Sequence, residues 1–532
     1  MSDRLDSWKE ICTYLARDRR TLGRWELERG MPVHRIPGGE KPRVYALRSE
    51  LDRWLKEGSA DAASASSRAE RPTLAVLPFV ILAGDKESEY FGDGLADDVI
   101  NALTRNPDLR VMARTSSFAF RRRDLDARQI GVRLGASVLL EGSLRRDGGR
   151  IRVCAQLVAT DDGCHLWGES YDRELVDIFA IQDEIAESIA RALSARLVPK
   201  GPGRRINPDL QAYGLWLQGR STALTYTAEA MHLAGGFFQA ALRADPSFAQ
   251  PHLGMAEMAW QATEFGLVPP RTGLAQVRSG VDRALALDDS LGEAHALDGA
   301  LRGLLDFDWA AAGRSFERAL AENPASGEVL SRHAWSYLAP QGRLIEADRV
   351  MDELVRLDPF SPLQQTFSGL LKFSLHDLDG AATAFRRALE VLPSLWWARY
   401  FLGAMTLLGG EIPRGMALCE EALRFHPGPV ADGARAAISG FAGLRDRARE
   451  ILADLLRANE AYSVSPVALA WAAIGAQDDR VFEWLDRCID DREPVILHFS
   501  HMPIYDTLRS DERFEALLRR MRLPGQPSPF GA

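Results

Sequence analysis

The segment AGRSFERALAENP, from Ala312 to Pro324, decides most of the fold because its spacing recurs along the chain. A small residue is followed four positions later by a bulky one, three later by another, usually small one, and five later by a proline. Further copies are Ala347, Met351, Leu354 and Pro359; Ala381, Phe385, Ala388 and Pro393; and Gly415, Cys419, Ala422 and Pro427. The prolines are 35, 34 and 34 residues apart, which indicates a repeated unit of one helix pair.

Each position of this unit has a physical role. Small side chains let two antiparallel helices approach closely, the bulky one fills the groove between repeats, and proline ends the unit because it cannot continue a helix. The pattern resembles the tetratricopeptide (TPR) repeat and predicts an all-α solenoid over residues 207–459, with roughly six to eight helix pairs. Earlier copies lie at Ala234, Phe238, Ala241 and Pro246 and, in degenerate form, around Val281 and Ala284. Residues 460–532 are expected to add weaker helices, at 466–474 and 480–488, and a terminal cap.

A solenoid of this kind has a concave surface that usually binds a protein or peptide segment. Side chains on the first helix of each pair can reach that surface. The candidates for protein binding are Tyr337, Trp396, Trp397 and Arg399. The alternative for the aromatic residues is that they belong to the core of the array.

Residues 72–200 alternate between strand and helix patterns, which predicts a mixed α/β domain. Thr73–Phe79 is a compact apolar run typical of a buried strand, and a helix is expected from Gly92 onward. Further predicted elements are a hairpin of 137–145 and 150–159 around Gly148 and Gly149, a helix at 128–134 and an amphipathic helix at 177–197.

The phrases LAVLPF, EYFGDGLADDVINAL, LGASVLLEGSLRRDGGRIRVCAQL and HLWGESYDREL carry a resemblance to a known domain. Residues 72–200 resemble the TolB N-terminal-like, or FlgO-like, domain over nearly their whole length. The resemblance implies a fold but no defined chemistry.

Three features of this domain are candidate sites. Asp93, Asp97 and Asp98 could hold a divalent cation, or could oppose the positive end of a helix dipole. His165 and Trp167 could form a metal or stacking site, or could pack on a strand. The run Arg121–Arg123 could contact an acidic partner, or form a solvated turn. No phosphate loop, GxSxG elbow or HExxH pair is present, so we expect no enzyme, no cofactor and no metal.

The N-terminal segment RDRRTLGRWE, Arg17–Glu26, is predicted to be the second helix of a helix-turn-helix. Asp18 is a suitable N-cap for it, and Ser7 for the helix before it. Alternating residues around Pro37, Gly38 and Gly39 predict a hairpin that would form a wing. Residues 1–57 resemble the winged helix-turn-helix of the MerR and excisionase type, which implies binding to double-stranded DNA.

The resemblance assigns contacts with DNA to Arg17, Arg19, Arg20, Thr21, Arg24, Trp25, His34, Arg35, Lys41 and Arg43. The alternative is that Trp25 is core and the arginines form a solvated face. Residues 1–57 hold thirteen Lys or Arg against ten Asp or Glu, so they carry +3 in a chain of net charge −9. So small a positive excess predicts only modest affinity for a polyanion, so a homodimer or another partner is expected to contribute to binding. Residues 58–71, rich in Ser and Ala, are expected to be a flexible linker.

Length and composition set the class of the protein. A chain of 532 residues with 46% apolar residues has room for three or more domains. Its five scattered cysteines form no CxxC pair, which indicates a reducing compartment, and no apolar stretch reaches membrane-spanning length. A cytoplasmic location is therefore expected.

These observations favour a cytoplasmic, DNA-binding transcriptional regulator. In it the α/β domain senses or transmits and the repeats bind a protein. The alternative is a TPR scaffold or adaptor that does not bind DNA. A signalling enzyme is disfavoured because no cyclase-like segment is visible.

Overall fold

The computed structural model divides into two compact units, Met1–Arg71 and Pro72–Ala532. The described residues are 4–5, 7, 10–11, 14, 33–36, 43–48, 51, 72–83, 86–106, 108–121, 125–147, 149–174, 178–193, 208–224, 228–264, 266–424, 429–458 and 479–524. Predicted features that lie outside them are the linker at 58–71, the helix at 466–474, Pro427, Arg122 and Arg123.

The N-terminal unit contains a small antiparallel sheet with strand order β1-β3-β2. Its strands are β1 (Arg4–Leu5), β2 (His34–Ile36) and β3 (Arg43–Leu47). The pairing of β2 with β3 confirms the predicted hairpin, and β1 is a third strand that the sequence pattern does not indicate. Buried apolar residues of this unit are Leu5, Ile11, Val44, Ala46 and Leu51. The predicted recognition helix, Arg17–Glu26, lies outside the described residues.

The second unit begins with a mixed sheet of strand order β6-β4-β7-β8-β9, in which β5 also pairs with β7. The strands are β4 (Thr73–Val76), β5 (Val80–Ala83), β6 (Arg110–Val111), β7 (Val138–Asp147), β8 (Arg150–Ala159) and β9 (His165–Glu174). β4 pairs in parallel with β6 and β7, whereas β7, β8 and β9 form an antiparallel meander. The β7–β8 pairing runs without a break from Val138↔Ala159 to Asp147↔Arg150 and confirms the predicted hairpin.

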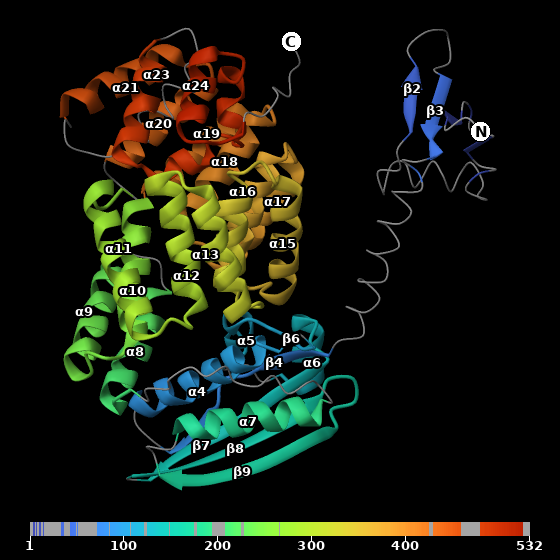
Figure 1. The fold of residues 1–532 in the computed structure, drawn as a ribbon, viewed down its shortest axis with the longest axis vertical. Helices are drawn as coiled ribbons and strands as arrows, with labels where there is room; N and C mark the ends of the chain where they lie inside the picture. The colour runs from blue at the N-terminus through green and yellow to red at the C-terminus, as the bar shows by residue number, and fades with distance from the viewer. Residues whose placement is uncertain are drawn as a thin grey trace. The chain divides into compact units, whose positions relative to one another are not determined.

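Helices cover both faces of this sheet. They are α4 (Lys86–Thr104), α5 (Arg114–Phe118), α6 (Ala127–Leu134) and α7 (Ile178–Ala192). α4 and α7 lie on one face of the sheet (Figure 1), where Leu95 and Ile185 share a core with Leu74. Ala75 points the other way and packs with Ile130 of α6, as the alternation of a strand requires.

Helix α4 begins earlier than the sequence pattern predicts, at Lys86 rather than near Gly92. Lys and Glu are good helix formers, so the polar stretch from Lys86 to Glu89 extends the helix instead of forming a loop. Asp93, Asp97 and Asp98 therefore lie in the middle of a helix. The interpretation that these acids oppose the positive end of a helix dipole is wrong.

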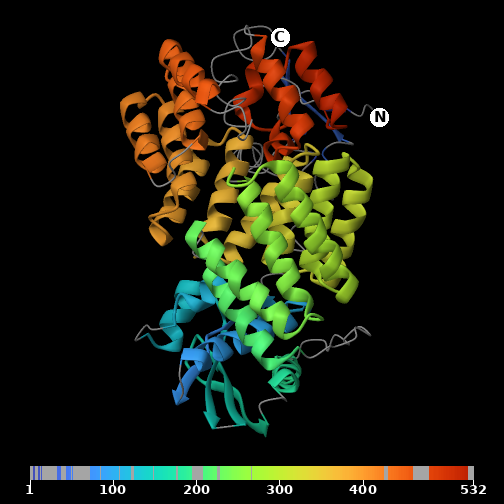
Figure 2. The same ribbon diagram turned by 90° about the vertical axis from the view of Figure 1, so that its left-hand side faces the viewer.

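The rest of the unit is all-α and is built from antiparallel helix pairs (Figures 1 and 2). The pairs are α8 (Leu210–Ala223) with α9 (Ala228–Ala244), α10 (Ala249–Glu264) with α11 (Pro270–Leu287), α12 (Gly292–Leu301) with α13 (Trp309–Glu322), α14 (Gly327–His333) with α15 (Leu344–Leu357), α16 (Pro362–Ser374) with α17 (Leu378–Val391), α18 (Trp396–Leu408) with α19 (Ile412–Arg424), and α20 (Pro429–Phe441) with α21 (Arg445–Ala458). The π-helical turns η2 (Arg302–Asp306) and η3 (Ala334–Leu338) continue α12 and α14.

The packing inside a pair explains the repeated spacing. Phe316 of α13 is 1% exposed, and a Cβ added at Gly299 of α12 would lie 2.8 Å from its ring. Phe385 of α17 packs against Gly369 of α16 in the same way, since a Cβ added at Gly369 would lie 2.6 Å from the Phe385 ring. In these two pairs the bulky residue of the second helix thus packs directly on the backbone of the first, and the all-α repeat region is confirmed.

The C-terminal segment differs from the predicted terminal cap. It comprises α23 (Arg480–Asp491), the 3₁₀ turns η4 (Pro494–His498) and η5 (Pro503–Leu508), and α24 (Glu512–Arg520). Its hydrogen bonds reach the middle of the array: Trp309 Nε1 donates to the Met521 carbonyl at 2.9 Å, and Ser500 Oγ to the Pro340 carbonyl at 2.9 Å. The segment folds back along the repeats, because its buried apolar residues join the core of the central pairs.

Candidate protein-binding cavity

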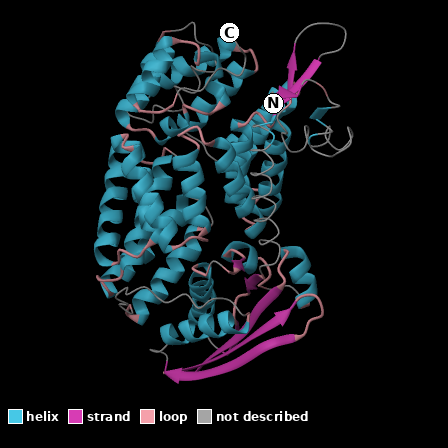
Figure 3. Cartoon of the chain, turned by 45° about the vertical axis from the view of Figure 1, so that its right-hand side comes forward, coloured by secondary structure: helices cyan, strands magenta, loops and turns pink. Residues whose placement is uncertain are grey.

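A cavity of about 1450 Å³ lies on the concave side of the array. The first helices α8, α10, α12, α14, α16 and α18 supply most of its lining, and α4, α7, η4 and the end of the outer helix α13, with Arg318 and Glu322, add to the wall. Figure 3 shows the strands of this unit gathered at one end, below the helices of the repeats. The cavity is therefore a joint product of the repeats, the α/β domain and the C-terminal segment.

The α/β domain closes the cavity because it contacts repeats that are far apart in sequence. Its α4 packs on α8 at the start of the array, where Leu217 lies against Gly94. Its α5 reaches the α15–α16 connection, where the Ser116 amide and hydroxyl both donate to Asp358 Oδ1, at 3.0 and 2.6 Å. Burial raises the pKa of Asp358 to about 6, against the effect of these hydrogen bonds.

The C-terminal segment supplies part of the wall through η4. The His498 ring lies 4.2 Å from the Trp335 ring, centroid to centroid, and its Nδ1 is 3.2 Å from Nε2 of His501. The other ring nitrogen of His501 is 3.0 Å from Ser374 Oγ. Burial lowers the pKa of His498 to about 3, so this stack is uncharged near neutral pH.

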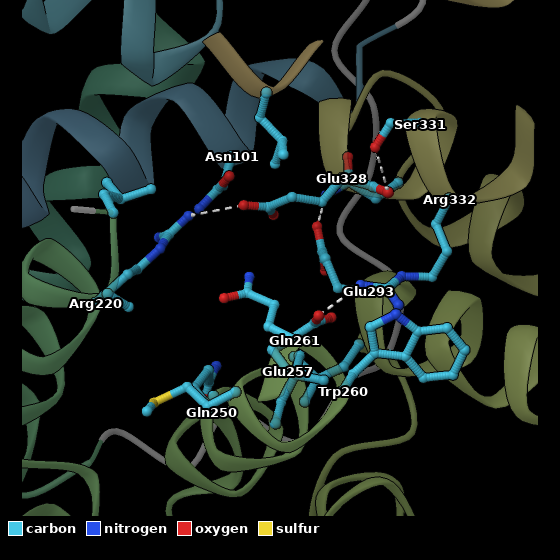
Figure 4. Close-up of a pocket in the computed structure, with 18 of the residues that line it drawn as sticks. Asn101, Arg220, Gln250, Glu257, Trp260, Gln261, Glu293, Glu328, Ser331 and Arg332 are labelled. Carbon is cyan, nitrogen blue, oxygen red and sulfur yellow. Dashed lines mark hydrogen bonds and ion pairs between the residues drawn. The ribbon is translucent and has the colours of Figure 1, made fainter. Parts of the chain in front are cut away.

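One end of the cavity is acidic. Figure 4 shows the side chains of Glu257, Glu293 and Glu328 between those of Arg220 and Arg332. Arg332 donates a charge-assisted hydrogen bond to Glu257 and lies 5.5 Å from the centre of the Trp260 ring. Glu293 accepts from Ser326 Oγ at 2.8 Å, and an outer helix contributes a further donor, Asn323 Nδ2, at 3.1 Å.

Four carboxyl groups at this end have raised pKa values, among them Glu257, whose pKa is raised by burial despite its pairing with Arg332. The Glu328 side chain is 63% accessible because it faces the open cavity, and its carboxylate is 3.8 Å from Arg220 Nη2. Protein surrounds that space, and the resulting desolvation raises the pKa of Glu328 to about 7. Burial likewise raises the pKa of Glu264 and of Asp98 to about 7.

The other end of the cavity is aromatic. The ring centroids of Trp335 and Phe367 are 5.5 Å apart, and those of Phe367 and Trp397 are 5.8 Å apart. Phe401 and Trp396 also line this end. The acidic and aromatic ends together let the cavity bind a ligand that carries both a charge and an apolar group.

Of the four predicted protein-binding residues, the structure places two in the cavity lining and two outside it. Trp396 and Trp397 line the cavity. Tyr337 does not, because its ring packs 5.3 Å from that of Phe316 in the space left by Gly313. Arg399 is also outside the lining, since it pairs with Glu421 at 2.8 Å and donates to the Pro393 carbonyl at 2.6 Å.

The side chains of the candidate sites in the α/β domain contact other residues of the chain. Asp93 pairs with Arg121, and Asp97 pairs with Arg220 and Arg114. Within the described ranges, no group of three or more His, Cys, Asp or Glu side chains is arranged to hold a metal ion. His165 and Trp167 lie on β9, where His165 is exposed and Trp167 Nε1 donates to Glu169 at 3.3 Å.

Only part of the predicted DNA-binding set falls on described residues. His34 and Arg35 lie on β2 and Arg43 on β3, in the register His34↔Tyr45 and Ile36↔Arg43. The others lie outside the described residues: Arg17, Arg19, Arg20, Thr21, Arg24, Trp25 and Lys41.

The carboxylates of the cavity carry no motif in the sequence. Glu257, Glu264, Glu293 and Glu328 belong to three different repeats, and ordinary solvated glutamates share their local pattern. Their common position on first helices is the one signal that could have grouped them.

Comparisons with known proteins give partial matches. No protein-family model matches the chain. It is 36% identical over 229 residues to "Putative adenylate cyclase 3" of Rhizobium meliloti (strain 1021), covering 42% of this chain and 39% of that protein. It is 32% identical over 162 residues to cellulose synthase operon protein C of Pseudomonas fluorescens (strain SBW25), covering 29% of this chain and 12% of that protein. The chain thus spans less than half the length of either relative.

Similar solved structures include the human IFIT1 dimer with m7Gppp-AAAA, at 15% identity and TM-score 0.43, over 65% of this chain and 80% of that one. Another is PilW, a type IV pilus biogenesis factor, at 18% identity and TM-score 0.32, over 40% of this chain and 94% of that one. Among the described residues no helix combines the length and apolarity needed to cross a bilayer. The spacing and packing of its own helix pairs show a multidomain protein with an all-α repeat region.

Proposed function

We propose that this protein is a TPR interaction scaffold that binds a segment of a partner protein in the cavity. The observation that carries the proposal is the cavity itself, which six first helices line together with α4, α7 and η4. At about 1450 Å³ it exceeds the roughly 300–1,000 Å³ typical of small-molecule pockets, so it suits several residues of a peptide. No catalytic role is part of the proposal.

A peptide-display selection on the full-length chain tests this function. Peptides selected from a random library should lose binding to the Gln261→Trp variant, because Gln261 lines the cavity on α10 and an indole there fills it. The matched control is Gln239→Trp, on the exposed side of α9 and outside the lining. Peptides that bind both variants equally would place recognition elsewhere and exclude this function.

A second candidate concerns the N-terminal unit, which we propose binds double-stranded DNA. It is supported by the β2–β3 hairpin where a wing is expected, by the +3 charge of residues 1–57 and by the resemblance of that segment. In this proposal the protein is a cytoplasmic transcriptional regulator, its α/β domain senses or transmits a signal, and its repeats recruit a protein.

The DNA proposal is tested by titrating fluorescent duplex DNA with the full-length chain at several salt concentrations. The Arg20→Glu/Arg24→Glu variant should lose salt-dependent binding. Arg387→Glu, an exposed arginine of α17, is the control for the change in charge. Equal binding by the wild type and the double variant would exclude a recognition role for this segment and leave the scaffold alone.

A further inference from the structure

The cavity lining is strongly unbalanced in charge. Eleven carboxyl groups and four guanidinium groups line it, a formal excess of seven negative charges. The whole chain, by comparison, carries −9 over 532 residues. Such an excess in an enclosed space repels a polyanion and attracts a cation more strongly than an open surface does.

Ion pairs join three of these carboxylates to arginines of the lining: Glu257 to Arg332, Glu322 to Arg318 and Glu328 to Arg220. Arg332 is committed to Glu257, and Arg220 pairs with Asp97 in the wall and is 3.8 Å from Glu328. In the described part of the chain, no ion pair joins Asp98, Glu264 or Glu293 to a cation. The acidic end therefore retains charge that a ligand can neutralise.

A second observation points to a ligand independently of charge. Gln364 of α16 is only 7% exposed and lines the cavity, yet its Oε1 is fully buried and accepts no hydrogen bond in the described structure. Its Nε2 is 4.0 Å from the position of a Cβ on Gly327, next to Glu328, and Phe367 lies one turn further along α16. Gln364 thus lies between the acidic and aromatic ends, and a bound N–H group would satisfy its buried acceptor only after the amide turns toward the cavity.

The aromatic end can bind an apolar side chain of the ligand that lies next to the ligand's charged residue. Trp335, Phe367 and Trp397 form a continuous series of ring contacts, and the His498 ring beside Trp335 is neutral. Aromatic faces attract both apolar side chains and the alkyl stem and charge of Lys or Arg.

We propose that the cavity selects a peptide segment in which a Lys or Arg adjoins a large apolar side chain. The positive group lies among Glu264, Glu293 and Glu328, the apolar one against Phe367 and Trp397, and a backbone N–H donates to the Gln364 amide oxygen once that side chain turns into the cavity. This inference rests on the proposed scaffold function, and names the class of partner that the same cavity takes.

The test uses the peptides selected by the full-length chain. Those that lose binding to Gln261→Trp should be enriched in Lys or Arg next to Phe, Tyr, Trp, Leu or Met. One such peptide, measured by fluorescence anisotropy, should bind the Glu264→Gln/Glu328→Gln variant about tenfold more weakly or worse. A Lys→Glu analogue of the same peptide should lose as much affinity for the wild-type chain. This second measurement tests the charge pairing without any change to the protein.

The matched control is Glu317→Gln/Glu390→Gln, which makes the same change in charge at exposed positions of the outer helices α13 and α17. Its affinity should equal that of the wild type. Cavity-bound peptides that are neutral or acidic, or that bind the Glu264→Gln/Glu328→Gln variant equally well, overturn the inference and leave the scaffold function standing. A single-stranded oligonucleotide whose binding Gln261→Trp abolishes also overturns it. Selection of no peptide above background overturns both proposals.

Discussion

Asp97 and Asp98 are neighbours on α4, and their surroundings are opposite. The Asp97 side chain is 3% accessible and pairs with Arg220 and with Arg114, the latter at 3.8 Å. Asp98 has no cation partner among the described residues; it accepts hydrogen bonds from Tyr213 and, at 2.7 Å, from Gln182, and it borders the cavity. Desolvation raises its pKa to about 7, despite these hydrogen bonds.

The comparison separates two uses of a buried acid. Asp97 joins α4 to α5 and α8, so its charge holds the α/β domain against the first repeat. Asp98 and Glu264 lie at the cavity surface and have no ion-pair partner in the described part of the chain. The charge of Asp97 is therefore matched by arginines of neighbouring helices, whereas Asp98 is held by hydrogen bonds alone.

The largest effect is expected for Asp97→Ala. Removing this carboxylate leaves the guanidinium groups of Arg114 and Arg220 without their shared partner, so the free energy of unfolding should fall by about 3–5 kcal/mol. Urea denaturation followed by circular dichroism measures it. Asp98→Asn keeps a hydrogen-bond acceptor and should cost less than about 1 kcal/mol. Equal losses of unfolding free energy at the two positions would contradict a structural role for Asp97 that Asp98 does not share.

A smaller effect is expected for Ser116→Ala, at the second contact of the α/β domain with the repeats. The Ser116 hydroxyl donates to Asp358 and accepts from the Phe360 amide at 2.9 Å. Asp358 is held by hydrogen bonds rather than by a cation, so the loss in unfolding free energy should be about 1–3 kcal/mol. Thr383→Ala, which removes an exposed hydroxyl of α17, should change it by less than about 0.5 kcal/mol. If the two losses are similar, this contact does not stabilise the domain arrangement.

The smallest effect expected is the pH dependence of stability that arises from Glu328. Its carboxyl has a pKa near 4.5 when unfolded and about 7 when folded, so the folded chain holds the extra proton between those values. The stability that this proton contributes is full below the unfolded pKa and is lost as the pH rises through the folded one. Arg220, Glu293, Asp97 and Glu257 act on this group and remain in the variant.

Relative to Glu328→Gln, the wild-type melting temperature should therefore fall as the pH is raised from about 5 to about 8. Taking the difference removes the opposite contributions of buried histidines such as His498. Differential scanning fluorimetry over this range measures it, with Glu317→Gln as the control. A constant difference between the wild type and Glu328→Gln would mean that Glu328 is hydrated like a surface glutamate.

Local patterns predicted much of the fold. The spacing of Ala312, Phe316 and Pro324 was enough to identify the helix pairs, because each pair packs within about 35 residues of chain. Gly149 and its flanking strands were enough for the β7–β8 hairpin, for the same reason of locality. The early start of α4 was missed because its first turns are polar and carry no apolar periodicity.

The candidate site was predicted only in part. Trp396 and Trp397 were found because aromatic side chains on a first helix can face the concave surface. Tyr337 follows the same pattern and packs elsewhere, because Gly313 opens a space on the neighbouring helix. The cavity glutamates were missed because a glutamate in an enclosed space and one in solvent look alike in the sequence.

The sequence by itself determined the helix pairs, the hairpins and the excess of acid in the body of the chain, since these follow from spacing and composition. Tertiary structure alone decided the cavity, because its walls join residues such as Ser116 and Asp358, which are 242 positions apart. It also decided which of two adjacent aspartates is neutralised. Burial and the positions of arginines on other helices set the state of each acid, and no local pattern records them.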